Sequence, residues 1–224
     1  MSSMDDALPA FLDAAATAVR LLERPELAGH WAGASVLPEF SVAGLAGHLF
    51  RGMSTVERYL GEPGPGGPEP SEAEPSGAGI SAARYFDTVI RSADISDPAN
   101  QAIRARGEEA AAGGPAALAS DARATLERLT SRLADEGLGR PVRVAGGLVM
   151  TLDEYLRTRV VELVVHADDL AASVGVELVP PQPATTAVAI DVLVGVARIR
   201  HGDLAVLRAL ARRERDTVGA LRVL

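Results

Sequence analysis

Residues 151–175, TLDEYLRTRVVELVVHADDLAASVG, predict one long helix and decide the fold. Thr151 and Glu154 form the pattern of a capping box, which opens helices, and Gly175 is a residue type that ends them. At about 100° per residue, the centre of this stretch, residues 160–167, is apolar nearly all the way round. Because such a helix is buried on most of its sides, we expect residues 151–174 to form a long, largely buried helix of a bundle.

Apolar residues at helical spacing predict three more long helices. They cover about residues 5–23, 42–60 and 115–136. Ser41 is the expected N-cap of the second of them, and Pro115 suits the first turn of the third. Shorter helices are expected at about residues 80–92, 98–112, 184–200 and 203–215. Residues 141–150, PVRVAGGLVM, predict two short strands joined by Gly146 and Gly147.

The fold class follows from these elements and from the connections between them. Residues 24–40 and the Pro-, Gly- and Glu-rich segment 61–77 are expected to be loops. Four long helices with one long crossover predict a mainly α-helical four-helix bundle with a small β-hairpin. We expect residues 1–175 to form this bundle and residues 176–224 to form a C-terminal helical extension packed on it.

Composition excludes several classes of function. The net charge of −8 argues against a nucleic-acid partner, which needs a basic face. We see no apolar run near the roughly 20 residues of a membrane span and no signal-peptide pattern at the N-terminus, so we expect a cytoplasmic protein. The chain has no cysteine, so any thiol chemistry must use a thiol from outside. A homodimer is compatible with the sequence.

The pair Glu162 and His166 is the first chemical signal. The two residues are four positions apart in an apolar helix, so their side chains lie on one face and can hold one ion together. A buried carboxylate needs a partner. Glu162 could satisfy that need by binding a metal, by pairing with Arg159 or by hydrogen bonding to His166, and the pattern leaves these alternatives open.

A third ligand must come from elsewhere, and His48 is the best candidate among the other histidines. It lies next to the apolar stripe of the helix at 42–60, with Gly44 and Gly52 four residues before and after it. These glycines weaken the helix, and they indicate either space around the imidazole or close helix packing. His30 and His201 have the sequence context of surface residues.

Three stretches resemble the mycothiol-dependent maleylpyruvate isomerase family of the DinB-like superfamily. Residues 41–49, SVAGLAGHL, resemble the family's helix with the first histidine ligand, and residues 152–159 resemble the entry to its last bundle helix. Residues 159–170, RVVELVVHADDL, resemble its motif of Arg, Glu, His and Asp. The resemblance covers about residues 5–175, and it implies that His48, Glu162 and His166 are metal ligands.

The chemistry expected of such a site is metal-dependent. Three protein ligands leave coordination positions open, as in catalytic zinc sites. The resemblance implies zinc, although nickel, iron and cobalt accept the same ligands. It also implies mycothiol as the external thiol, which a metal would hold as thiolate for attack on a small electrophile. We therefore expect an S-transferase or isomerase. The alternatives are a hydrolase with metal-bound hydroxide and a non-catalytic metal-binding module.

Three more residues of the same helix are candidates for the site. Arg159 could clamp a substrate carboxylate or pair with Glu162. Asp169 could accept the second ring N–H of His166, or it could be an ordinary solvated charge. Tyr155 shares the stripe of Arg159 and His166, so it either lines the cavity or belongs to the core. The sequence gives no signature for the substrate or for the role of residues 61–79.

Overall fold

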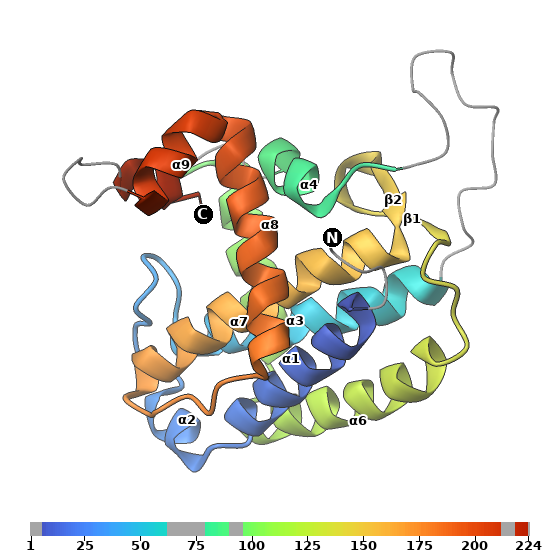
Figure 1. Ribbon diagram of the computed structural model, residues 1–224. Helices are drawn as coiled ribbons and strands as arrows, with labels where there is room; N and C mark the ends of the chain where they lie inside the picture. Colours follow the sequence, from blue (N-terminus) through green and yellow to red (C-terminus); the bar gives the residue numbers. More distant parts are fainter. Residues whose placement is uncertain (1–5, 62–78, 90–95, 212–217, 224) are drawn as a thin grey trace.

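A four-helix bundle forms the centre of the protein (Figure 1). The structure is a computed structural model and describes residues 6–61, 79–89, 96–211 and 218–223. The bundle helices are α1 (Ala7–Leu22), α3 (Val42–Gly61), α6 (Pro115–Leu133) and α7 (Leu152–Val174). Helices α1 and α3 each pack against both α6 and α7. This arrangement confirms the predicted mainly α-helical fold.

The remaining helices surround this bundle. They are α2 (Pro25–His30), α4 (Ala82–Val89), α5 (Pro98–Ala111), α8 (Pro183–His201) and α9 (Asp203–Ala211), with short 3₁₀ turns η1 (Ala145–Gly147) and η2 (Val218–Leu221). Helix α5 packs on α3, and α8 packs on α7, α4 and α1. The predicted loop at residues 24–40 was wrong in part, because α2 occupies its first half with Pro25 in the first turn. The predicted loop at 61–77 lies outside the described residues except for Gly61, which ends α3.

The predicted hairpin is confirmed as an antiparallel pair. Strands β1 (Pro141–Arg143) and β2 (Val149–Thr151) pair with Val142 opposite Met150, and both of these side chains are buried. None of the helices in the described part of the chain combines the length and apolarity needed to cross a bilayer. The domain boundary near residue 175 stays a prediction.

The ends of α7 follow from its sequence. The Thr151 hydroxyl accepts a hydrogen bond from the Glu154 backbone N–H, and Gly175 ends the helix at φ 69°. Only half of the expected capping box is used in this way. The Glu154 carboxylate instead accepts a hydrogen bond from the backbone N–H of Ala82, at 2.6 Å. Glu154 therefore holds the first turn of α4 beside α7.

Glycines bring α3 close to its neighbours. A Cβ atom on Gly52 would lie 2.9 Å from the Leu163 side chain of α7, and one on Gly47 would lie 2.0 Å from the backbone oxygen of Gly107 in α5. A Cβ on Gly44 would lie 2.5 Å from Glu108, also in α5. Close helix packing therefore accounts for Gly44 and Gly52. The contact at Gly52 lets α3 approach the part of α7 that carries Glu162 and His166.

Candidate metal centre

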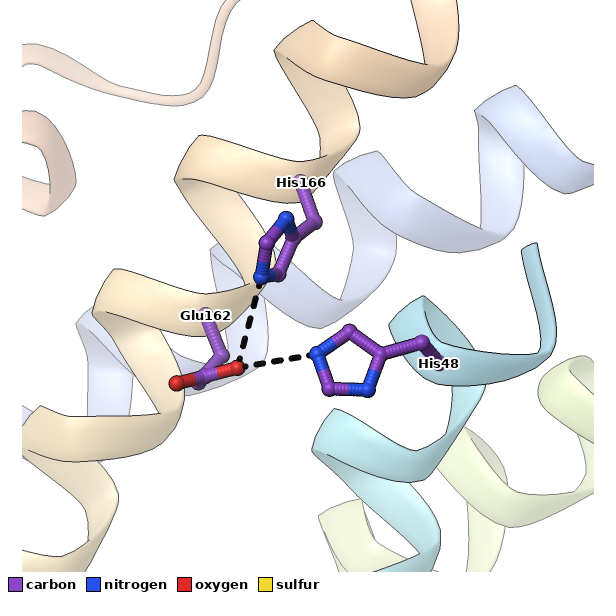
Figure 2. A group of neighbouring side chains, drawn as sticks. All are labelled: His48, Glu162 and His166. Atoms are coloured by element: carbon purple, nitrogen blue, oxygen red, sulfur yellow. Dashed lines mark ion pairs between the residues drawn. The ribbon is translucent and has the colours of Figure 1, made fainter. Parts of the chain in front are cut away.

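Helices α3 and α7 bring His48, Glu162 and His166 together (Figure 2). The Oε2 atom of Glu162 lies 3.3 Å from Nε2 of His48 and 3.5 Å from Nε2 of His166. The two imidazole rings meet edge to face, with centroids 4.8 Å apart. The three side chains are only 17–21% exposed. The structure therefore places one carboxylate oxygen between two ring nitrogens in a mostly enclosed position.

This donor set fits a divalent metal ion. One ligand atom from each residue lies within 4.8 Å of the other two. Nitrogen and oxygen ligands at about 2.0–2.2 Å from a tetrahedral ion are separated by about 3.3–3.6 Å. The two contacts of the Glu162 oxygen already have this separation, 3.3 and 3.5 Å. Metal ligation by these residues stays a prediction, which the two contacts of the Glu162 oxygen support.

Burial and mutual contacts set the charges of the three residues. Burial raises the pKa of Glu162, but hydrogen bonds with His166 and His48 and the charge of Arg159 lower it more, so its pKa lies well below its usual value. Burial lowers the pKa of His48 below its ordinary value. Burial also lowers the pKa of His166, but hydrogen bonds to Asp169 and Glu162 outweigh that effect and raise the pKa to about 9. Without a metal, the positive charge of protonated His166 thus offsets the negative charges of the neighbouring carboxylates.

Loading the metal-free protein with zinc at pH 6.5 is expected to release about one proton per site. His166, with its pKa raised to about 9, is protonated at this pH and must lose that proton to coordinate a metal. His48 and Glu162, whose pKa values are lowered, contribute less. Calorimetric titration in two buffers of different ionisation enthalpy measures the released protons. Zinc binding without proton release would contradict the assigned protonation state of His166.

Asp169 lies where a positioning partner for His166 is needed. Its Oδ2 atom lies 3.0 Å from Nδ1 of His166, which leaves Nε2 facing Glu162. The Ser173 hydroxyl donates to the backbone oxygen of Asp169 and accepts a hydrogen bond from the backbone N–H of Val36. Asp169 therefore makes the contact predicted for it and is linked to the loop before α3.

Asp169→Asn is expected to weaken metal binding by about 10–100-fold, because partners that orient a histidine ligand have effects of this size. The side-chain volume is nearly unchanged, so the effect comes from the weaker acceptor at Nδ1. Competition with a chromophoric chelator measures the affinity. Asp168→Asn is the matched control, since Asp168 is the preceding residue and is exposed. Equal affinities of the two variants would exclude the positioning role.

Arg159 lies among the three tyrosines of the chain. Its guanidinium carbon is 5.1 Å from the centroid of the Tyr155 ring, and its Nε donates to the Thr158 hydroxyl at 3.0 Å. Its charge also acts on Tyr85 and Tyr59. Within the described part of the chain, the ion pairs of Glu162 are with the two histidines, so Arg159 influences Glu162 through its field rather than by direct pairing.

The other predicted candidates lie outside the centre. Tyr155 belongs to the core, since it is 1% exposed and its hydroxyl donates to Thr55 at 2.9 Å. Burial raises the pKa of Tyr155 to about 12, so it stays protonated. His30 is exposed on α2, and His201 is exposed at the end of α8, as their sequence contexts indicate.

Two residues near the centre had no signal in the sequence. The Phe40 ring lies 5.8 Å from the His48 ring, although Phe40 belongs to the loop before α3. Tyr85 lies on α4, where burial raises its pKa while the charge of Arg159 lowers it. Each is brought near the site by tertiary contacts, so no spacing rule within one helix could have indicated it.

Comparison with known proteins identifies a family. The family model described as the mycothiol maleylpyruvate isomerase N-terminal domain matches residues 11–171, well over half of the chain. The matched region includes His48, Glu162 and His166 and agrees with the resemblance stated above. No curated protein and no solved structure matches the chain.

Proposed function

Because the chain belongs to the mycothiol maleylpyruvate isomerase N-terminal domain family, we propose that it is a metal-dependent enzyme that uses mycothiol. Its reaction joins the thiol sulfur to an electrophilic carbon of a small molecule. In S-transfer the thiolate displaces a leaving group, or adds to a double bond whose other carbon takes up a proton, and the new carbon–sulfur bond persists. In isomerisation the sulfur leaves again after rotation about the former double bond. The observation that carries the proposal is the cluster of His48, Glu162 and His166.

In this proposal, His48 and His166 supply imidazole nitrogens and Glu162 supplies one carboxylate oxygen to a divalent metal, with zinc as the expected ion. When bound, the metal lowers the pKa of an incoming thiol and keeps it as thiolate near neutral pH. The absence of cysteine from the chain supports an external source of this thiol.

Protein groups around the ligands have separate roles. Asp169 holds the His166 ring with Nε2 directed at the centre, supported by the 3.0 Å contact at Nδ1. Arg159 supplies a fixed positive charge close to Glu162, and it can stabilise negative charge that develops on an electrophile during sulfur addition. The Arg159 guanidinium lies over the Tyr155 ring, and this contact helps to keep the charge in place.

Turnover of a reporter electrophile, such as a bromomethyl bimane, tests this function. The zinc-loaded protein is assayed with mycothiol, without thiol, and after removal of the metal by a chelator. The proposal predicts turnover above the uncatalysed rate only when metal and mycothiol are both present. Thiol-independent hydrolysis of an ester would favour a metal-dependent hydrolase. No turnover of either kind would favour a non-catalytic metal-binding module.

A further inference from the structure

The loop before α3 forms a hollow beside the metal centre. This loop hollow has a volume of about 390 Å³. It is lined by Ala32, Gly33, Ala34, Ser35, Leu37, Pro38, Glu39, Phe40 and Ser41. Sites for small ligands have volumes of about 300–1,000 Å³, so the loop hollow is large enough for part of a cosubstrate.

Phe40 connects the loop hollow to the metal centre. Phe40 is one of the residues that line the hollow, and its ring lies 5.8 Å from the ring of His48, tilted by 53°. The His48 ring in turn lies 4.8 Å from that of His166. One of the residues that line the hollow is thus the direct ring neighbour of His48, a candidate metal ligand.

The loop is held in a defined shape before any ligand arrives. Ala34 and Ser41 form an isolated antiparallel bridge, and the backbone N–H of Ser35 donates to the Phe40 oxygen at 2.9 Å. The backbone N–H of Val36 donates to Ser173 of α7 at 3.0 Å. Glu39, at φ 65°, adopts a conformation that is uncommon for residues other than glycine. Such conformations persist where the surroundings enforce them, and they cluster at ligand sites.

The lining of the hollow indicates the chemistry of its ligand. Glu39 is the one charged residue among the nine that line it, so an anion would be repelled. A carboxylate accepts hydrogen bonds from hydroxyl groups, while Phe40 and Pro38 offer apolar surfaces. A sugar ring has both a hydroxyl-bearing edge and an apolar face. Mycothiol carries its thiol on a neutral, polyhydroxylated group of this kind.

We propose that the loop hollow binds the sugar part of mycothiol, so that its sulfur reaches the metal centre past Phe40. This inference rests on the proposed function and names the subsite that selects mycothiol over simpler thiols. The loop hollow then determines thiol specificity, whereas the three ligand residues support chemistry with any thiol.

The test compares mycothiol with N-acetylcysteine, a thiol that lacks the sugar part. The ratio of their kcat/KM values is measured for the wild type, Phe40→Leu and Val36→Ala. Val36 is the matched control, because it is an exposed apolar residue of the same loop whose side chain does not line the hollow. This ratio does not depend on the fraction of protein loaded with metal.

Phe40→Leu is expected to reduce the preference for mycothiol by about tenfold, the effect of losing one aromatic contact. Val36→Ala is expected to keep the wild-type preference. An unchanged preference in Phe40→Leu would overturn the proposal, as would an equal loss in both variants. A rise in KM for the electrophile alone would assign the hollow to the electrophile and would also overturn it.

A binding measurement separates this proposal from the proposed function. N-acetylglucosaminyl-inositol, which has the neutral sugar part and no thiol, is titrated into the full-length metal-free protein and followed by NMR. Saturable shifts at residues 32–41, weakened about tenfold by Phe40→Leu but not by Val36→Ala, would support the subsite even if no turnover were found. No binding to the wild-type protein would overturn the subsite even if thiol-dependent turnover were found.

Discussion

Glu162→Gln is expected to lower thiol-dependent turnover by more than about 100-fold. Residues that only orient a metal ligand already change metal affinity or activity by about 10–100-fold, and loss of a ligand has a larger effect. The Oε2 atom of Glu162 contacts both imidazoles, at 3.3 and 3.5 Å. It therefore links the histidine of α3 to the histidine of α7. Glutamine keeps the shape of the side chain but lacks the negative charge that binds a cation.

The assay for this variant measures turnover and metal content per chain, with circular dichroism to compare folding. Asp168→Asn is the matched control, because it removes an exposed carboxylate from the same helix. It should retain wild-type turnover. Wild-type turnover by Glu162→Gln with no bound metal would contradict the proposed chemistry, since the reaction would then proceed without the ion.

Gly47→Ala is expected to lower the free energy of unfolding by about 1–3 kcal/mol, the effect of forcing extra volume into a packed core. The added Cβ would lie 2.0 Å from the backbone oxygen of Gly107 and 2.9 Å from its carbonyl carbon. Because a backbone cannot move aside as a flexible side chain can, α5 would have to shift away from α3. The clash outweighs the gain in helix propensity, which is at most about 1 kcal/mol.

Chemical denaturation of metal-free protein measures this effect without a contribution from metal binding. Gly61→Ala is the matched control, because Gly61 ends the same helix and its added Cβ would meet nothing within 4 Å. We expect Gly61→Ala to be neutral or slightly stabilising. Equal stabilities of the two variants would show that α3 and α5 are not in the close contact described.

Helix α7 and its chemical motif could be predicted because the residues that specify them lie close together in the sequence. Thr151 and Gly175 mark the ends of α7 in the sequence itself, and both act as predicted. Glu162 and His166 share a helix face by virtue of their spacing. The role of His48 could not be predicted from spacing alone, because its approach to α7 depends on packing between segments that are distant in the sequence. The resemblance to a family supplied that information.

Features made by contacts between segments could not be predicted in the same way. The glycines of α3 indicated either space around an imidazole or close helix packing, and their contacts with Leu163 and residues of α5 could not be found from any pattern within α3. Glu154 was assigned to the cap of its own helix, although its carboxylate binds the backbone of Ala82. Phe40 reaches His48 because the loop before α3 folds back on that helix. Short α2 was missed although Pro25 marks its first turn.

Elemental analysis of purified protein tests most directly the claim that α3 and α7 hold one ion together. The wild type is compared with His48→Ala and His166→Ala, and His30→Ala serves as the control because His30 is exposed on α2. We predict about one divalent ion per chain in the wild type and in His30→Ala, and little metal in the other two variants. Equal metal content in His48→Ala and the wild type would contradict the shared site.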